Sequence, residues 1–494
     1  MKLLAQAFRW LALSAALALV VVTVLYLFFD LRLVVDGEGF HLRFVKSADE
    51  LAAEIVAHRE AQQRAAVETP PVENPAPETV PATPAPFAGQ PAAGEAVVEP
   101  GAGPPAASNG WTGFRGPRRD GHYTETAIVT AWPPGGLEPM WKQPVGGGYA
   151  SFAVANGRAF TIEQRGPEEV VAAYDIETGR ELWTNRWTAL FSEILGGDGP
   201  RATPAWADGF VYALGGTGEL RCLDDETGSV VWRTNILEDH GAANISWGMA
   251  ASPLIVDDTV VVLPGGPNGH SVAAYDRQTG NVVWTALDDE QGYTAPMLAT
   301  IGGVRQIVVF SGERILGLTT DGSRLLWAHP WETYAGINAA QPVVLSENRI
   351  FVSSGYGVGA AVLEIDPAGD TFTVREVWRN IRMKNQFAGS VLHDGHLYGL
   401  DGAILACIDA ATGELKWKGG RYGYGQVVLA DGHLIVLTEN GDLALVDATP
   451  ERHVEIARFP AIEGKTWNYP ALSEGRLIVR NLQQMAAFDL RRER

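Results

Sequence analysis

Eleven side chains of this sequence have types and positions that suit the binding of a ligand or a peptide. Each lies between the aromatic residue that ends one apolar repeat and the apolar run that opens the next. Aromatic rings stack on planar groups, and Asn, Lys and Arg hydrogen-bond to them, so the set suits a planar anion or an extended peptide. The candidate binding residues are Trp187, Arg201, Asn244, Trp247, Tyr293, Asn338, Lys384, Asn385, Tyr424, Lys465 and Trp467. The alternative is that they only pack and solvate the loops that carry them.

Sequence patterns of known catalytic or metal chemistry are missing. No HExxH, GxSxG, Walker loop or EF-hand run occurs. His393 and His396 share a turn without a third ligand nearby in the sequence, and His396 and His433 fit strand positions better than a metal site. The glycines of residues 355–359 resemble a dinucleotide loop, but no helix follows them. We therefore predict no catalytic residue and no metal site.

Composition excludes several classes of protein. The net charge of −20 repels nucleic acid, so we expect no nucleic-acid partner. With 46% hydrophobic and 19% charged residues, the 494-residue chain has ample material for a core. Its two cysteines cannot make a disulfide framework or a multi-thiolate zinc site.

The elements that must position the candidate residues come from a repeat. Four segments share the pattern [A/C]-x-D-x-x-T-G-x-x-x-W and end at Trp183, Trp232, Trp284 and Trp417. In such a hairpin the Asp accepts hydrogen bonds from turn amides, the Gly supplies a positive φ, and the Trp packs on a neighbouring unit. Looser copies end at Trp327, Trp378 and Phe459. The predicted structural docking residues are Trp141, Trp183, Trp232, Trp284, Trp327, Trp378 and Trp417.

A second hairpin precedes the first in each unit. Its turns include Asn156-Gly157, Asp208-Gly209, Asp394-Gly395 and Asp431-Gly432, which are strong hairpin signals. Units of four strands that recur every 39 to 52 residues are typical of propeller blades. The last unit lacks an outer strand, and residues 137–143 look like an outer strand without a partner. The sequence thus predicts an all-β, eight-bladed propeller of four-stranded blades over residues 109–494.

Three further segments precede the propeller. Residues 10–29 carry no charge and predict an uncleaved transmembrane helix within residues 1–30, with the N-terminus in the cytoplasm. Residues 31–66 predict a small membrane-proximal hairpin plus a helix whose apolar stripe is Leu51, Ile55 and Val56. Residues 67–108, with eleven prolines and five glutamates but no Lys or Arg, predict a disordered Pro/Ala-rich linker.

The repeat resembles the tryptophan-docking motif of the PQQ-like β-propeller superfamily, which includes quinoprotein alcohol dehydrogenases and the BamB-like scaffold of outer-membrane protein assembly. The segment Trp111-Thr112-Gly113-Phe114-Arg115-Gly116-Pro117 is similar to the W-x-x-F-R-G-P lead-in of bacterial members. Two departures matter. Cys222 and Cys407 are too far apart for the adjacent-cysteine disulfide of the dehydrogenases, and no N-terminal cysteine is present for a BamB-like lipid anchor.

The resemblance implies two functions of different classes. We expect a binding or scaffold module for other envelope proteins or peptides, held in the bacterial inner membrane through residues 10–29, with the propeller in the periplasm and no cofactor. The alternative is a quinoprotein alcohol or sugar dehydrogenase with PQQ and calcium in the propeller funnel. A sensor of small ligands is a third alternative, although a flexible linker transmits signals poorly.

Overall fold

The computed structural model describes Val21 and residues 31–36, 39–44, 46, 48–68 and 110–492. Apart from Val21, the predicted transmembrane helix therefore lies outside the described residues, and so does nearly all of the predicted linker. Within the described ranges, no helix combines the length and apolar character needed to span a membrane.

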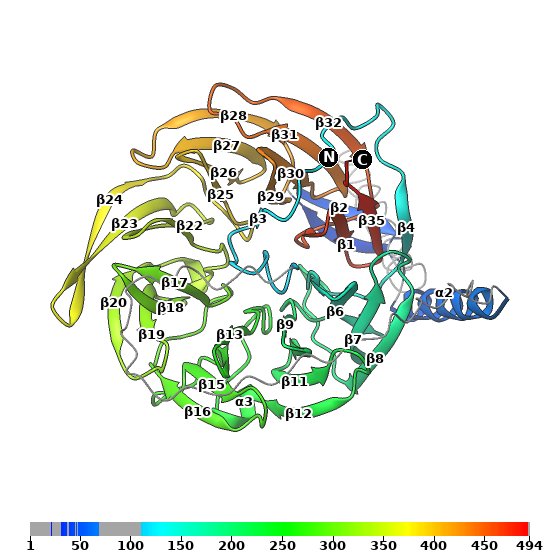
Figure 1. Cartoon of the computed structure of the whole chain (residues 1–494), viewed down its shortest axis with the longest axis horizontal. Coiled ribbons are helices and arrows are strands. Elements are labelled where there is room, and N and C mark those ends of the chain that lie inside the picture. Colours follow the sequence, from blue (N-terminus) through cyan, green and yellow to red (C-terminus); the bar gives the residue numbers. More distant parts are fainter. Residues whose placement is uncertain are drawn as a thin grey trace, which may run out of the picture.

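Eight antiparallel sheets form a ring in the described part of the chain, which confirms the predicted propeller (Figure 1). Each sheet is one blade, and its strands follow one another in order from the ring's inside to its outside. Blade 1 comprises β5 (Ala153–Ala155), β6 (Arg158–Arg165), β7 (Glu168–Asp175) and β8 (Glu181–Thr188). Blade 2 comprises β9 (Ala205–Ala207), β10 (Phe210–Leu214), β11 (Glu219–Asp224) and β12 (Val230–Asn235), followed by the short helix α3 (Ile236–Asp239).

Blades 3 to 5 continue the same order. Blade 3 comprises β13 (Leu254–Val256), β14 (Thr259–Val262), β15 (Val272–Asp276) and β16 (Val282–Ala286). Blade 4 comprises β17 (Met297–Ile301), β18 (Val304–Phe310), β19 (Arg314–Thr319) and β20 (Leu325–Pro330), and the 3-10 turn η1 (Tyr334–Gly336) follows. Blade 5 comprises β21 (Val343–Ser346), β22 (Arg349–Ser354), β23 (Gly359–Ala368) and β24 (Thr371–Asn380).

Blades 6 to 8 complete the ring. Blade 6 comprises β25 (Val391–His393), β26 (His396–Asp401), β27 (Ile404–Asp409) and β28 (Leu415–Arg421). Blade 7 comprises β29 (Gln426–Ala430), β30 (His433–Leu437), β31 (Asp442–Asp447) and β32 (Glu455–Pro460). Blade 8 comprises β33 (Ala471–Ser473), β34 (Arg476–Arg480) and β35 (Gln484–Asp489), and its outer strand is β4 (Pro139–Pro144) from before blade 1. The predicted closure by residues 137–143 is thus confirmed.

The repeated turn packs against the tryptophan of the preceding blade. In blade 1 the Asp175 carboxylate accepts hydrogen bonds from the Thr178 N–H (2.8 Å) and hydroxyl (2.7 Å). This turn brings Gly179, at φ +69°, beneath the indole of Trp141, whose N–H donates to the Ile176 carbonyl at 2.9 Å. A Cβ on Gly179 would lie 2.6 Å from that ring, so no other residue fits. The same contact joins Trp183 to Gly228.

Residues 110–123, which the sequence marked only as a lead-in, run through the middle of the ring (the cyan segment in Figure 1). The carbonyls of Trp111 and Thr112 accept hydrogen bonds from the first two blades, at Val154 and Trp206. The segment ends in strand β3 (His122–Tyr123), which pairs in parallel with β29 on the inner side of blade 7. The centre of the propeller is therefore occupied by the chain itself.

Two buried arginines hold this central segment. The Arg115 guanidinium donates to the Ser390 carbonyl at 2.7 Å and to the Tyr469 hydroxyl at 3.2 Å. Arg119 donates to the carbonyls of Ser252, Pro253 and Pro296, which precede the inner strands of blades 3 and 4. Burial lowers the pKa of the Arg119 guanidinium to about 9, so it still carries its charge at neutral pH.

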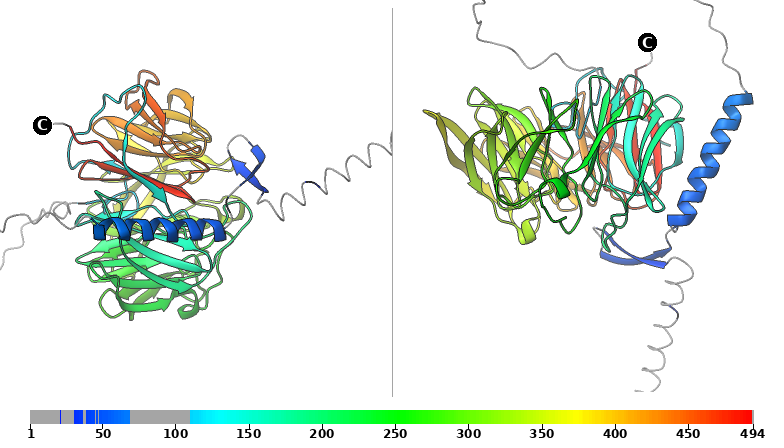
Figure 2. Two further views of the ribbon diagram at one scale, coloured as in Figure 1. Left: turned by 90° about the vertical axis from the view of Figure 1, so that its right-hand side faces the viewer. Right: turned by 90° about the horizontal axis from the view of Figure 1, so that it is seen from below.

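The N-terminal elements have the predicted types. Strands β1 (Leu31–Asp36) and β2 (Gly39–Phe44) form an antiparallel hairpin, and helix α2 (Ala48–Glu68) follows. The helix lies along the outer wall of the propeller (Figure 2). Leu51 and Ile55 of the predicted apolar stripe are buried, whereas Val56 is 56% exposed.

We predict that Arg119→Ala destabilises the propeller strongly, because it leaves three buried carbonyls without a donor at about 1–3 kcal/mol each. The thermal transition of the purified full chain should fall by on the order of 5 °C or more. Arg118→Ala is the matched control, since the Arg118 side chain is half exposed and pairs with the neighbouring Asp120; its transition should stay within about 1 °C of the parent. Equal shifts in both variants would show that the central segment does not brace the ring.

Candidate functional site

One face of the propeller collects two sets of loops. Consecutive antiparallel strands alternate in direction, so the connection from an outer strand to the next inner strand ends on the same face as the hairpin between the second and third strands of a blade. We call this face the mouth. Its inter-blade connections are residues 145–152, 189–204, 236–253, 287–296, 331–342, 381–390, 422–425 and 461–470.

An aromatic cluster occupies the mouth where blades 6, 7, 8 and 1 meet. The Trp467 ring stacks on Tyr149 (5.3 Å between centroids) and lies 4.8 Å from Phe387, which in turn contacts Tyr424 at 5.6 Å. The Lys465 ammonium lies 3.9 Å from the Trp467 ring centroid. Three predicted residues, Tyr424, Lys465 and Trp467, are thus brought together, and we call this group the Trp467 cluster.

A second pair lies on the other side of the mouth. Trp247 and Tyr293 meet edge to face with centroids 5.8 Å apart. Asn244, on the same connection as Trp247, donates to the Gly216 carbonyl at 2.8 Å. All three residues lie on the connections of the mouth between blades 2 and 3 or between blades 3 and 4.

Two of the predicted mouth cations, Arg201 and Lys384, are paired with carboxylates. Arg201 donates to Glu193 at 2.8 Å and stacks over Phe191 and Tyr149. Lys384 forms an ion pair with Asp401. The positive charges of Arg201 and Lys384 are therefore compensated by carboxylates of the protein, which disfavours the binding of an anion at these two residues.

The Asp401 carboxylate is stabilised by two lysines. Its carboxylate also accepts from Lys418 at 2.7 Å. Burial alone would raise the pKa of the Asp401 carboxyl, but the hydrogen bonds from Lys384 and Lys418 hold it below its usual value.

Two predicted binding residues on the mouth loops, Asn338 and Asn385, are buried. Asn338 and Asn385 are 0% and 1% exposed. The Asn338 amide donates to the Ser311 carbonyl and accepts from the Ser354 hydroxyl, both at 2.8 Å. The Asn385 amide donates to the Leu400 carbonyl at 3.0 Å. Both side chains hold loops in position and do not face the solvent.

Trp187 stands apart from the other tryptophans, at the end of β8. The Arg221 guanidinium lies over its ring at 4.2 Å, and the indole is a neighbour of the Glu169 carboxyl. Glu169 is fully buried and accepts from the Gly216 N–H at 2.8 Å. Burial outweighs this hydrogen bond and raises the pKa of the Glu169 carboxyl to about 7.

Three residues of the mouth, Tyr149, Phe387 and Glu439, were not among the binding residues predicted from the sequence. Tyr149 and Phe387 carry no charge or motif, and Glu439 lies in a hairpin inside blade 7, where its carboxylate accepts from the Trp467 indole at 2.8 Å. Apart from Trp187 at the end of β8, the candidate residues predicted from the sequence lie between one blade and the next, whereas Glu439 lies within a blade. The alternation of strand direction is the signal that could have added the hairpins, because it brings them to the same face.

Exposed apolar side chains occur on four of the mouth loops, between blades 1 and 2, between blades 4 and 5, between blades 5 and 6 and within blade 5. Six large hydrophobic residues more than 40% exposed lie on these loops: Leu190, Ile194, Leu195, Tyr334, Tyr356 and Ile381. Ile194 and Tyr334 are the most exposed, at 88% and 76%. The other large hydrophobics of comparable exposure in residues 110–492 belong to strands.

Comparison with known proteins places this geometry among related propellers. The family model described as outer membrane protein assembly factor BamB matches residues 167–419. BamB of Bordetella pertussis is 23% identical over 59% of this chain and 71% of its own length, and BamB of Burkholderia pseudomallei is 25% identical over 65% and 91%. The quinohemoprotein alcohol dehydrogenase ADH-IIG of Pseudomonas putida is 31% identical, but over only 27% of this chain and 19% of its own.

Solved structures show the same fold. The crystal structure of BamB from Moraxella catarrhalis matches with a TM-score of 0.50 and 14% identity over 72% of this chain and 99% of that one. Quinohemoprotein alcohol dehydrogenase from Comamonas testosteroni matches with a TM-score of 0.56 and 12% identity over 79% and 82%. At such identities the likeness shows the fold alone.

We predict that Glu169 makes stability depend on pH. The folded protein holds this proton up to about pH 7, whereas the unfolded chain releases it near pH 4.5, so folding loses stability as the pH rises from about 4.5 to 7. Glu169→Gln cannot ionise and keeps the acceptor for Gly216. Between pH 5 and pH 8, the free energy of unfolding of this variant should rise relative to that of the parent by up to about 3 kcal/mol. Urea unfolding at the two pH values measures this gain, and parallel pH profiles would contradict it.

Proposed function

Because this chain belongs to the PQQ-like, BamB-like β-propeller family, we propose that it is a recognition module that binds segments of other cell-envelope proteins at its mouth. The BamB relatives are named as outer membrane protein assembly factors, and they cover more of this chain than the dehydrogenase relative does. Their names support a role in which this chain binds other proteins of the cell envelope.

The observation that carries the proposal is the set of exposed apolar residues at the mouth. Large hydrophobic side chains exposed on one face favour a protein-binding surface. Aromatic anchors such as Tyr334 and Tyr356 contribute most to protein interfaces, because they bury much area at little cost in side-chain entropy. The paired state of Arg201 and Lys384 disfavours a small anion as the principal ligand.

Anchoring and domain organisation belong to the same proposal. We place residues 10–29 in the inner membrane as a single span, with the N-terminus in the cytoplasm and the propeller in the periplasm. Residues 31–66 form the membrane-proximal unit, 67–108 the linker and 109–494 the binding domain. Anchoring raises the effective concentration of the mouth near partners in the same membrane.

A quinoprotein dehydrogenase is the second candidate, favoured by the match to ADH-IIG. The residues present do not fit the quinone as the resemblance requires. Cys222 and Cys407 are separate, buried, free thiols in blades 2 and 6. The predicted anion-binding cations Arg201 and Lys384 are paired with Glu193 and Asp401. Among the described residues, His, Cys, Asp and Glu side chains form no group of three that could hold a metal ion.

We predict that the exposed mouth aromatics capture the partner. The double variant Tyr334→Ser, Tyr356→Ser should lower capture of envelope proteins by the purified full chain about tenfold or more, since each anchor is worth about 1 kcal/mol or more. The measurement identifies the envelope proteins that the purified chain captures. It compares them with the proteins that crosslink, in intact cells, to a photoreactive side chain at position 334. The thermal transition should stay nearly unchanged, because both side chains are exposed.

The matched control is Val230→Ser, Val231→Ser, which removes two exposed apolar side chains from the outer strand β12, away from the mouth. If both double variants capture equally well, the mouth is the wrong surface. The half-buried Trp187, Trp247 and Trp467 suit this test less well, because truncating them disturbs the packing around them.

For the cofactor we predict a flat titration. Adding PQQ with calcium to the purified full chain should leave tryptophan fluorescence without a saturable change at micromolar ligand, after correction for absorbance. Saturable one-to-one quenching would favour the dehydrogenase instead, and alcohols and sugars would then be screened with an artificial electron acceptor.

A further inference from the structure

Helix α2 is held firmly on the outer wall of the propeller. Leu51 and Ile55 are 8% and 1% exposed, and Arg59, one turn further along the same face, is 7% exposed. Gln62, a turn beyond, donates to the side-chain Oε1 of Gln143 at 2.9 Å. The contact therefore runs over several turns of the helix.

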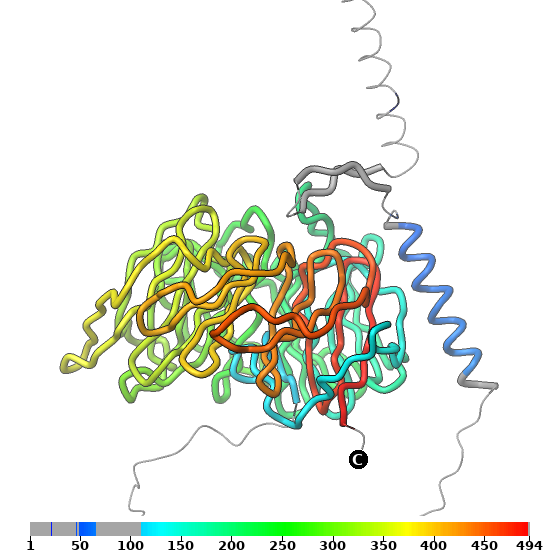
Figure 3. Tube along the Cα trace, turned by 90° about the horizontal axis from the view of Figure 1, so that it is seen from above, coloured from blue at the N-terminus to red at the C-terminus, as the bar shows by residue number. Residues whose placement is uncertain are grey.

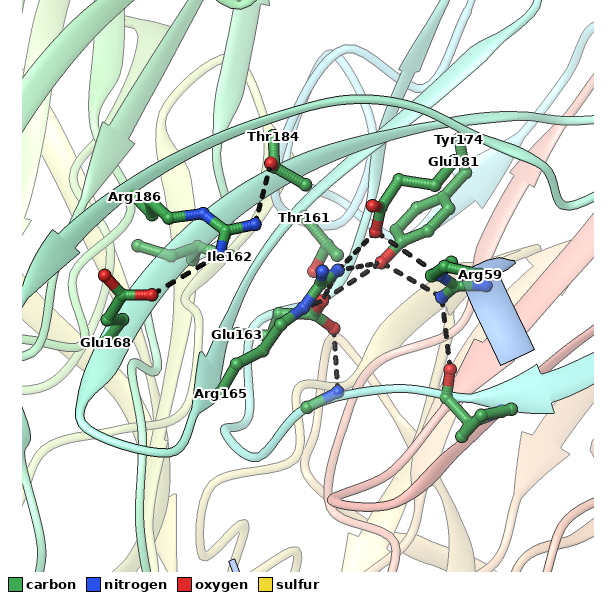
Figure 4. A network of polar contacts seen from close by, with 12 residues as sticks. Arg59, Thr161, Ile162, Glu163, Arg165, Glu168, Tyr174, Glu181, Thr184 and Arg186 are labelled. Atoms are coloured by element: carbon green, nitrogen blue, oxygen red, sulfur yellow. Dashed lines mark hydrogen bonds and ion pairs between the residues drawn. The ribbon is translucent and has the colours of Figure 1, made fainter. Parts of the chain in front are cut away.

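Arg59 joins the helix to a charged network between blades 8 and 1 (Figure 4). Its guanidinium donates to the Gln143 side chain at 2.8 Å, pairs with Glu181 at 3.3 Å and lies 5.0 Å from the Tyr174 ring centroid. Glu181 also binds Arg165 at 2.5 Å. Removing one partner from so buried a network leaves uncompensated charge, so the docked position is strongly preferred.

The innermost member of this network is Glu163, and its carboxylate is stabilised in part by Arg59 of the helix. Glu163 is fully buried and lies against Arg165. Burial alone would raise the pKa of the Glu163 carboxyl, but Arg165, Arg480 and Arg59 hold it below its usual value. A charge from α2 thus stabilises a carboxylate in the core of blade 1.

The direction of α2 on the wall is defined. The helix begins on the mouth side of the propeller and ends on the opposite side, where the chain's C-terminal end lies (Figures 2 and 3). Any chain that enters α2 from a membrane therefore arrives on the mouth side.

The chain before α2 is short. Only 18 residues, 30–47, separate the proposed membrane span from Ala48, and even fully extended they reach about 60 Å. Twelve of them are folded into the β1–β2 hairpin, which shortens the reach further. The long segment after α2 adds no freedom, because the helix is already docked on the propeller.

We infer that helix α2, docked through Arg59, orients the propeller with its mouth toward the membrane that holds residues 10–29. The partner bound at the mouth is then a protein of that membrane, or a segment emerging from it, with an apolar extracytoplasmic surface. Ile194 and Leu195 at the mouth rim match such a surface. The orientation rests on the proposed span, and the class of partner rests on the proposed function.

Fluorescence quenching from the lipid surface tests the orientation without any partner. The full chain is placed in lipid nanodiscs that contain lipids with a nitroxide headgroup, and a fluorophore is attached to Ile194→Cys or to Asp370→Cys. Asp370 lies in the exposed turn between β23 and β24, on the face opposite the mouth. The native Cys222 and Cys407 are buried and do not compete for the label.

Quenching should be at least threefold stronger at position 194 than at position 370. Adding Arg59→Ala should shrink this difference, whereas Arg64→Ala, an exposed arginine on the same helix, should preserve it. The comparison of the two labels in the otherwise unchanged protein decides the matter even if Arg59→Ala folds poorly.

Equal quenching at both positions, stronger quenching at position 370, or a full chain that does not enter the nanodiscs would each overturn the inference. Capture by the mouth could survive these results, so the proposed function would stand or fall separately. Strong quenching at position 194 together with failed capture would instead keep the orientation and remove the mouth as the partner's site.

Discussion

The contact between the tryptophan of one blade and the turn glycine of the next is the constraint on which the rest of the structure depends. The Trp141 indole lies where any Cβ on Gly179 would be, and its N–H is satisfied by the Ile176 carbonyl at 2.9 Å. The same contact joins Trp183 to Gly228, Trp232 to Gly280, Trp284 to Gly322 and Trp378 to Gly413. Five of the eight junctions between blades are thus set at a similar angle, and a repeated angle closes into a ring. Closure demands that the last blade also find a partner, and this is why the Trp141 strand must come from before the first blade. The mouth exists because closure brings eight sets of loops to one face.

The chain before the first blade does structural work that its composition does not suggest. Residues 110–123 occupy the centre of the ring, where Arg115 and Arg119 satisfy carbonyls near the inner strands of several blades. Helix α2 reinforces the ring from outside, because Arg59 donates to Gln143 and Pro144 of β4, the strand that closes the ring. Buried arginines thus brace the ring at its axis and at its seam. A ligand has access from the mouth only as far as this central segment allows.

The chemistry of the mouth follows from how its charges are arranged. Arg201 and Lys384 have carboxylate partners in the protein, and six large aromatic or aliphatic side chains on the mouth loops are more than 40% exposed. This arrangement suits a protein surface better than a planar anion, and it agrees with the greater coverage by the BamB relatives. The proposed orientation would add a direction to that chemistry, because a mouth that faced the membrane would meet proteins of that membrane first.

The sequence by itself determined the features that depend on near neighbours in the chain. The Asp-x-x-Thr-Gly turns, the Asn-Gly and Asp-Gly hairpins, the number of blades and the spare strand at Trp141 were all predictable, because each rests on contacts within about ten residues and on counting repeats. Only the tertiary structure decided which polar groups meet. Asn338 and Asn385 are drawn inward by carbonyls of neighbouring loops, and Arg59 meets Gln143 across 84 residues of sequence. Such pairings depend on how separate blades and helices pack, since burial makes each polar group take whichever partner the fold brings close.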